Sequence, residues 1–257
     1  MTDAELAAHL AECAGRILLE VRASGMFDGA QNAKALGKAG DQTANQFLIH
    51  ALKVQRPEDG LLSEESKDTP ERLTKSRVWI IDPVDGTREY GEARSDWAVH
   101  VGLAIDGVAQ VGAVALPGLP GPATGGGTVL RTDEPRDLPP REGPPRLLVS
   151  RTRPAAEAVA VAEKLGGELV AMGSAGAKAM AVVLGDAEIY LHSGGQYEWD
   201  SCAPVAVARA HGLHCSRIDG SPLVYNNSDT YLPDLLICRP EWAEPVLAEV
   251  RSLAPAD

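Results

Sequence analysis

The feature that most constrains the fold is an apolar run that ends in an acidic turn. Residues 78–81, Val-Trp-Ile-Ile, are followed directly by Asp82, Pro83, Val84, Asp85, Gly86 and Thr87. The apolar run predicts a buried strand, and Pro83 restricts the turn by fixing its own φ. Such a turn can direct Asp82, Asp85 and the Val84 carbonyl toward one point. Hard cations such as Mg²⁺ prefer oxygen ligands of this kind, and the alternative is an ordinary surface turn.

The composition indicates a globular, acidic chain. It has 257 residues, of which 44% are hydrophobic, and a formal net charge of −12 at pH 7. Because it has no Lys/Arg-rich block, we expect neither nucleic acid nor a membrane as a partner. No apolar run approaches the ~20 residues that a membrane span needs. An anionic substrate would therefore be held through bound cations, which reverse the charge of an acidic site.

The cysteines and the N-terminus indicate the compartment. Four cysteines form no CxxC pair, so we predict neither a zinc site nor a disulfide framework: Cys13, Cys202, Cys215 and Cys238. The segment Thr2-Asp3-Ala4-Glu5 is a capping box, and the amphipathic helix that follows is interrupted by charges, unlike a signal peptide. We expect a cytoplasmic protein, either a monomer or a homodimer.

Two patterns of elements meet near residue 145. In the first part we expect helices at the N-terminus and from Asp41 to Gln55, and strands at 60–63, 78–81, 97–105 and 108–116. Asp106-Gly107 predicts a hairpin between the last two strands. After the Pro- and Gly-rich residues 117–145, strands at 147–150, 169–172 and 187–192 alternate with helices at 154–165 and 175–184. A helix from Asp200, two short strands and a helix after Pro240 follow. We predict an antiparallel-rich α+β subdomain over 1–145 and an α/β subdomain over 146–257.

Three separate segments together resemble the signatures of the inositol monophosphatase superfamily, the lithium-sensitive, Mg²⁺-dependent sugar and nucleotide phosphatases. They are Glu64-Glu65, residues 82–87 and Glu198-Trp199-Asp200. The resemblance extends to Gly40-Asp41 and to Gly173-Ser174-Ala175, in the family's order over nearly the whole chain. It implies a layered αβαβα sandwich and a phosphomonoesterase that uses two or three Mg²⁺ ions.

The resemblance also implies roles for individual residues. The implied metal ligands are Glu64, Asp82, the Val84 carbonyl, Asp85 and Asp200. The implied catalytic residues are Asp41, Glu64 and Thr87, with Thr87 and Asp41 activating a water molecule. For Asp41, a helix N-cap is the alternative. The expected substrate contacts are Asp85, Gly86, Thr87, Gly173, Ser174, Lys178, Arg151 and Asp200, with the amides of Gly86 and Thr87 on the phosphate.

The residues after the motif favour a nucleotide bisphosphate as the substrate. Thr87-Arg88-Glu89-Tyr90 resembles the branch that hydrolyses 3′-phosphoadenosine 5′-phosphate, the CysQ type, and Ser193 stands where inositol phosphatases commonly carry Glu. Lys178 and Arg151 are candidates for the uncleaved phosphate, with solvated surface charges as the alternative. Glu89 is expected to join a metal network or to pair with Arg88.

The expected reaction is hydrolysis of the 3′-phosphate of adenosine 3′,5′-bisphosphate to AMP, with a role in sulfur assimilation. Inositol monophosphate and fructose 1,6-bisphosphate are alternative substrates, because the metal-binding residues are shared by all branches that the chain resembles. A non-catalytic phosphate-binding module is an alternative of a different class, since a fold alone does not establish function. Phosphate release by the purified protein with Mg²⁺ separates an enzyme from such a module, and a comparison of kcat/KM separates the three substrates.

Overall fold

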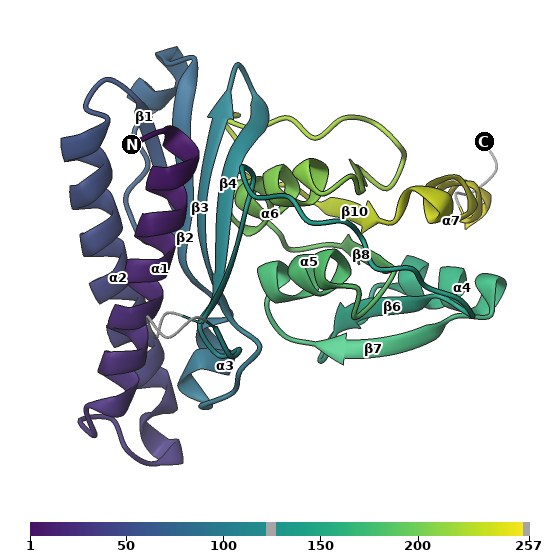
Figure 1. Ribbon diagram of the computed structural model, residues 1–257, viewed down its shortest axis with the longest axis horizontal. Helices are drawn as coiled ribbons and strands as arrows, with labels where there is room; N and C mark the ends of the chain where they lie inside the picture. The colour runs from purple at the N-terminus through teal and green to yellow at the C-terminus, as the bar shows by residue number, and fades with distance from the viewer. Residues whose placement is uncertain (122–126, 254–257) are drawn as a thin grey trace.

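The computed structural model of the protein describes residues 1–121 and 127–253. Helices and sheets alternate in five layers (Figure 1). The order of layers is a helix pair, a five-stranded sheet, a second helix pair, a second five-stranded sheet and a third helix pair. The predicted αβαβα sandwich is confirmed. Residues 122–126 of the Pro- and Gly-rich stretch lie outside the described residues. No helix of the described part is both long and apolar enough to cross a bilayer.

The first sheet is built from the N-terminal half of the chain. Its strands lie in sequence order: β1 (Gly60–Ser63), β2 (Arg77–Asp85), β3 (Ala98–Ile105), β4 (Val108–Leu116) and β5 (Thr128–Arg131). β1 is parallel to β2, and the other neighbours are antiparallel. Asp106 and Gly107 both have positive φ, as a two-residue hairpin turn requires, so the predicted hairpin is confirmed.

Two long helices cover the outer face of the first sheet. They are α1 (Asp3–Ala23) and α2 (Ala33–Gln55), and the short helix α3 (Thr87–Gly91) follows β2. Thr2 and Glu5 form the predicted capping box at the start of α1. The remaining short turns of 3₁₀ helix are η1 (Ala30–Asn32) and η2 (Pro70–Thr74).

The second sheet is mixed and comes from the C-terminal half. Its spatial order is β7 (Glu168–Met172), β6 (Arg146–Ser150), β8 (Ile189–Ser193), β10 (Asp234–Cys238) and β9 (His214–Ser216). β6 is parallel to β7 and β8, whereas β10 is antiparallel to β8 and β9. The helices α4 (Ala156–Leu165) and α7 (Pro240–Leu253) cover its outer face. The predicted alternation of strands and helices is thus observed.

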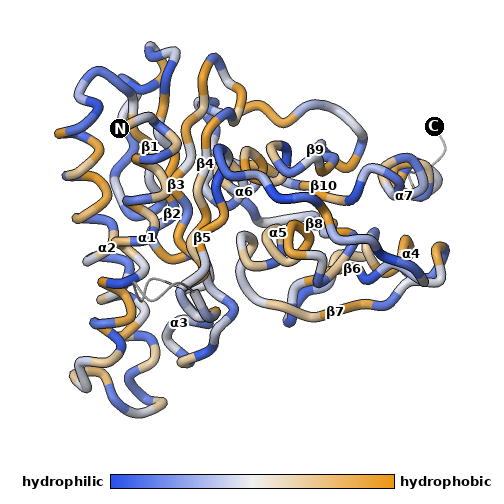
Figure 2. Tube along the Cα trace, in the orientation of Figure 1, coloured by the Kyte–Doolittle hydropathy of each residue, from blue (hydrophilic) through white to orange (hydrophobic). Residues whose placement is uncertain are grey.

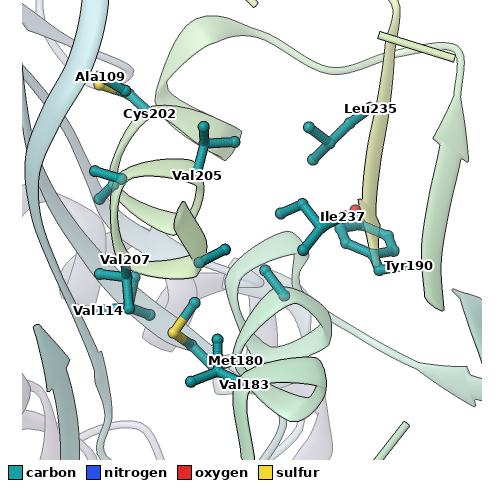
Figure 3. Close-up of a cluster of buried hydrophobic side chains, with 14 of the residues drawn as sticks. Ala109, Val114, Met180, Val183, Tyr190, Cys202, Val205, Val207, Leu235 and Ile237 are labelled. Carbon is teal, nitrogen blue, oxygen red and sulfur yellow. The ribbon is translucent and has the colours of Figure 1, made fainter. Parts of the chain in front are cut away.

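The middle helices, α5 (Ala175–Leu184) and α6 (Glu198–Ala210), join the two sheets through one apolar core. Figure 3 shows Val205 and Met180 of these helices between Val114 of the first sheet and Ile237 of the second. The strands are the most continuously apolar part of the trace, whereas the outer helices alternate polar and apolar residues (Figure 2). Burial on both faces therefore fixes each sheet in the sandwich.

The second helix begins earlier than its sequence predicts. The apolar pattern predicts a start at Asp41, yet α2 begins at Ala33 and includes Gly37 and Gly40, two residues of low helix propensity. The glycines allow close packing, because a Cβ at Gly37 would lie 2.8 Å from the Thr87 side chain and one at Gly40 would lie 2.6 Å from the Tyr90 ring. Asp41 consequently lies inside the helix, and the N-cap alternative for it is wrong.

Candidate active site

The parallel pairing of β1 and β2 brings two acidic segments to the same end of the first sheet. Ser63 is opposite Ile81 in the register, so Glu64 and Asp82 are the next residues of the two strands. The Glu64 amide also donates to the Ile81 carbonyl oxygen at 3.4 Å. A local strand register therefore juxtaposes carboxylates that lie 18 positions apart in the sequence.

Three aspartates converge on one point at this end of the sheet. One carboxylate oxygen from each of Asp82, Asp85 and Asp200 lies within 4.8 Å of the others. The predicted turn after Ile81 is wrong, because β2 continues through Asp85 with an irregularity in its pairing to β3 between Asp82 and Asp85. Asp82 and Asp85 therefore lie in the last four residues of β2, and Asp200 comes from the first turn of α6, where it accepts a hydrogen bond from the Tyr197 amide at 2.7 Å. Three hard anionic oxygens this close together fit the donor set that a divalent cation such as Mg²⁺ prefers.

The electrostatics of the cluster also favour a cation. Burial, reinforced by Glu64, Asp85 and Asp200, raises the pKa of Asp82 well above its usual value. Burial first and neighbouring acids second raise the pKa of Asp200 to about 7. Although Glu64 keeps access to solvent, burial of its carboxyl and the nearby acids raise its pKa to about 7. These carboxylates repel one another, and a bound cation would relieve that repulsion.

Asp85 differs from the other acids because hydrogen-bond donors surround it. It accepts from the Ser174 hydroxyl and from the amides of Ala175 and Gly176, at 3.1 and 2.6 Å, at the start of α5. Burial alone would raise its pKa, but His100, Ser174 and Lys178 outweigh burial and lower the pKa to about 2. Asp85 thus stays ionised and connects the end of β2 to the start of α5.

The site contains a hydroxyl–carboxylate pair next to the aspartates. The Thr87 hydroxyl lies 3.3 Å from Oδ1 of Asp41 and 3.1 Å from the Val84 carbonyl oxygen. Burial and the charge of Glu65 raise the pKa of Asp41 to about 7, even though the hydrogen bond with Thr87 opposes this shift. A carboxyl that titrates near neutral pH and contacts a hydroxyl is suited to proton transfer.

The Gly-Ser turn predicted to line the site lies against the acidic motif. Ser174 adopts a positive φ of 56° and caps α5 by accepting a hydrogen bond from the Ala177 amide at 2.9 Å. A Cβ on Gly86 would lie 3.2 Å from the Ser174 Cβ, and one on Gly173 would lie 2.4 Å from Glu89. These close contacts explain why glycine occupies both positions.

The two basic candidates are already engaged with protein groups. Lys178 is buried and donates to the Ser174 carbonyl oxygen, and Arg151 pairs with Glu89. Direct contact with a substrate phosphate would require either side chain to leave its partner. Of the two alternatives expected for Glu89, a metal network or Arg88, the pairing with Arg88 is wrong, because adjacent helical residues point in different directions. Arg88 instead reaches Glu92, four residues on, at 2.8 Å.

Two residues near the site were not identified from the sequence. His100 on β3 is fully buried, with Nε2 lying 3.2 Å from Asp85 Oδ2 and Nδ1 lying 2.9 Å from the Trp199 carbonyl oxygen. The sequence indicates its importance only by placing a polar residue within an otherwise apolar strand. Lys34 lines a pocket of about 440 Å³ together with Thr87 and Arg88. Lys34 was not predicted to lie near the site, because the predicted helix began at Asp41, whereas α2 begins at Ala33.

The fold and the acidic cluster define a class: layered α/β proteins with an acidic cluster that could bind a divalent cation, between strand ends and helix starts. The chain belongs to the inositol monophosphatase family, whose model matches residues 3–253. Solved structures agree on the fold. A CysQ protein from Bacteroides thetaiotaomicron matches with a TM-score of 0.76 at 23% identity, and the match covers 92% of this chain and 97% of that one. Inositol monophosphatase from Anabaena has a TM-score of 0.74 at 20% identity, covering 98% and 96%.

Relatives by sequence indicate a branch of the family. A protein of Mycobacterium leprae named 3′-phosphoadenosine 5′-phosphate phosphatase is 48% identical over 98% of this chain and 95% of its own length. The 3′(2′),5′-bisphosphate nucleotidase CysQ of Escherichia coli K12 is 27% identical over 87% of this chain and 94% of its own. The resemblance to the nucleotide-specific branch is therefore confirmed at the level of sequence similarity.

Proposed function

We propose that this protein is a Mg²⁺-dependent phosphomonoesterase that removes the 3′-phosphate of adenosine 3′,5′-bisphosphate to give AMP. The observation that carries the proposal is the convergence of Asp82, Asp85 and Asp200 beside the Thr87–Asp41 pair. The name of the Mycobacterium leprae relative supports the choice of substrate. A cytoplasmic role in sulfur assimilation, where this nucleotide is a by-product, is part of the same proposal.

The acidic residues would hold two or three Mg²⁺ ions. Asp82, Asp85 and Asp200 supply the converging oxygens, and Glu64 and the Val84 carbonyl extend the donor set. Mg²⁺ bound there supplies Lewis-acid stabilisation of the transferring phosphoryl group and favours ionisation of the attacking water. The hydrogen bonds that fix Asp85 to α5 keep its carboxylate oriented for this task.

Thr87 and Asp41 would orient and deprotonate the attacking water. The Thr87 hydroxyl donates to Asp41 Oδ1, which leaves the hydroxyl oxygen free to accept a hydrogen bond from water. Asp41, with a pKa of about 7, takes up the proton through this hydroxyl. We assign the amides of Gly86 and Thr87 to the phosphate, and the Gly173-Ser174 turn to the adjoining part of the substrate.

The uncleaved phosphate needs a positive side chain. Lys34 and Arg88 line the pocket of about 440 Å³ beside Thr87, and Lys34 has an exposed side chain. Lys178 and Arg151 remain candidates only if the substrate displaces their present partners, Ser174 and Glu89. Lys34 is therefore the cation most available to a second phosphate near the site.

Comparison of kcat/KM for three substrates with Mg²⁺ tests the proposal. We expect adenosine 3′,5′-bisphosphate to exceed inositol 1-phosphate and fructose 1,6-bisphosphate. A preference for inositol phosphate would overturn the substrate assignment. Absence of phosphate release from all three would favour the non-catalytic alternative.

One observation favours inositol monophosphate as a second candidate substrate. The Ser193 hydroxyl donates to Glu157 Oε2 at 2.7 Å. A carboxylate therefore lies next to the position where inositol phosphatases commonly carry Glu. Glu157→Gln should impair hydrolysis of inositol 1-phosphate more than that of the nucleotide if this carboxylate binds ring hydroxyls, and equal effects would exclude that role.

A further inference from the structure

A second pocket lies along the free edge of the first sheet. It has a volume of about 500 Å³, within the usual range for small-molecule sites, and is bounded by the end of α2, by β1 and by η2. β1 is the edge strand and pairs only with β2 within this sheet as the structure describes it, so its other side faces this pocket. No residue of the proposed metal site lines it.

Basic side chains are concentrated around this edge pocket. Three of the seven lysines of the chain line it, although the whole protein carries a net charge of −12: Lys53, Lys67 and Lys75. Among the described residues, no acidic side chain forms an ion pair with any of these three lysines. Their positive charge is therefore available to a ligand, in a chain whose general charge repels anions.

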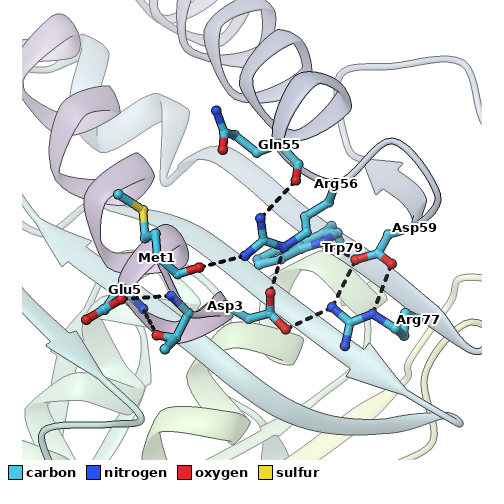
Figure 4. A network of polar contacts seen from close by, with 9 residues as sticks. Met1, Asp3, Glu5, Gln55, Arg56, Asp59, Arg77 and Trp79 are labelled. Atoms are coloured by element: carbon cyan, nitrogen blue, oxygen red, sulfur yellow. Dashed lines mark hydrogen bonds and ion pairs between the residues drawn. The ribbon is translucent and has the colours of Figure 1, made fainter.

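The other charged residues at the pocket are mostly neutralised by one another. Figure 4 shows Arg56 held by Asp3, and Asp59 held by Arg77 and by the Trp79 indole, which donates to it at 2.9 Å. Arg72 is buried and pairs with Asp68 at 2.7 Å. Only Glu71 among the lining acids is left to offset the three lysines, so the pocket has an excess of positive charge.

The walls of the edge pocket also offer apolar surface. Ile49 and Leu61 line the pocket and are half-buried, whereas Leu52 and Trp79 line it but are almost fully buried. Bare inorganic anions use only the charges of such a site. A ligand with a charged group on an apolar or aromatic body would use both, because apolar area removed from water adds to the attraction between charges.

The edge pocket is connected to the segment that carries Glu64. Ser63 and Ser66 line the pocket and bracket Glu64 in the sequence. Asn45 joins them, because it accepts from the Ser63 hydroxyl at 2.7 Å and donates to the Ser66 hydroxyl at 3.1 Å. A ligand that shifts this hydrogen-bonded segment would also shift Glu64.

We propose that the edge pocket is a second binding site, for a small organic phosphate or sulfate ester, and that its occupation alters the Mg²⁺ requirement through Glu64. The coupling to Mg²⁺ rests on the proposed function, whereas the binding site does not. The site is separate from the metal cluster and opposite to it in charge.

Calorimetric titration in EDTA tests the binding site. Without Mg²⁺ the acidic cluster repels anions, so binding of the probe 4-nitrophenyl sulfate reports the edge pocket. We expect one equivalent of the probe to bind the native chain. The affinity of Lys53→Gln/Lys75→Gln for the probe should be at least about tenfold lower, because two charged hydrogen-bond donors are lost. The control Lys38→Gln/Lys164→Gln makes the same change in net charge on exposed lysines that do not line this pocket.

No detectable binding, or equal weakening in both double variants, overturns the site. Equal affinity for inorganic sulfate and the aryl ester would show that the apolar walls contribute nothing and that an ion alone is bound. In activity assays, saturating 4-nitrophenyl sulfate should shift the Mg²⁺ concentration for half-maximal rate at least about twofold in the native chain only. An unchanged value would overturn the coupling while the calorimetric result stands separately.

Discussion

His100 and Asp85 form a buried pair, in which Nε2 of the fully buried histidine lies 3.2 Å from Oδ2 of the aspartate. The second ring nitrogen lies 2.9 Å from the carbonyl oxygen of Trp199, the residue before Asp200. One imidazole therefore connects two segments that supply acids to the proposed metal site. A Cβ on Gly176 would lie 2.0 Å from Nε2, so the glycine makes room for this arrangement.

Substitution of His100 should weaken metal binding. In His100→Ala, Asp85 and the Trp199 carbonyl lose their shared partner, and we expect Mg²⁺ affinity or activity to fall about 10- to 100-fold, as for other residues that orient ligands. Mg²⁺ titration of the activity measures this effect. His214→Ala is a matched control, because His214 hydrogen-bonds Ser216 on β9 instead. If both variants needed the same Mg²⁺ concentration as the native chain, His100 would have no positioning role.

The metal-free protein should lose stability as the pH rises from about 4.5 to about 7.5. Asp41, Glu64 and Asp200 have folded-state pKa values of about 7, above their unfolded values near 4, so between these values the folded chain binds more protons. Stability is then highest at low pH within this window and falls as the pH passes through the folded pKa. Thermal unfolding in EDTA measures the trend, and saturating Mg²⁺ should raise the midpoint most at the upper end. A midpoint that rises with pH in EDTA would contradict the assigned environments.

Tyr197 should discriminate nucleotides from sugar phosphates. Its ring stacks on Trp199 with centroids 4.9 Å apart, meets Tyr231 edge-on at 5.7 Å, and is 41% exposed beside Asp200. We expect Tyr197→Ala to raise KM for adenosine 3′,5′-bisphosphate about 5- to 100-fold, because an aromatic contact with a base contributes about 1–3 kcal/mol. KM for inositol 1-phosphate should change little, and Tyr197→Phe should retain nucleotide binding. A parallel rise for both substrates would exclude base stacking.

Gly37→Ala should destabilise the protein, although alanine normally favours a helix by about 1 kcal/mol relative to glycine. The new Cβ would lie 2.8 Å from Cγ2 and 3.2 Å from the carbonyl oxygen of Thr87, so the residue proposed to orient water must move. Unfolding midpoints and kcat measure the two consequences, and both should fall. A stabilised and fully active variant would show that α2 and α3 can separate at no cost to the site.

Local patterns predicted much of the fold, and tertiary packing decided the rest. The strand before Asp82 and the Asp106-Gly107 hairpin follow from short runs of sequence, and both are observed. The start of α2 does not, because the small size of Gly37 and Gly40 serves contacts with α3 that propensity does not register. His100 was missed because an isolated histidine in an apolar strand has no meaning until α5 and α6 pack against it.

The metal ligands and the basic residues illustrate the same limit. The acidic motif could be recognised because the spacing of carboxylates within one short segment is a local property, and the structure brings Asp200 to it from α6. The surroundings of Lys178 could not be predicted, because burial beneath the Ser174 turn depends on the packing of the central helices. Its role toward substrate stays a prediction.

The most direct test of the account is the activity of Asp82→Asn, measured as Mg²⁺-dependent phosphate release from adenosine 3′,5′-bisphosphate. Asp82 is buried among the acids of the cluster, so removing its charge should abolish activity by removing a metal ligand, and should raise the unfolding midpoint in EDTA by relieving repulsion. Activity within about tenfold of the native chain would contradict a catalytic metal site built on Asp82.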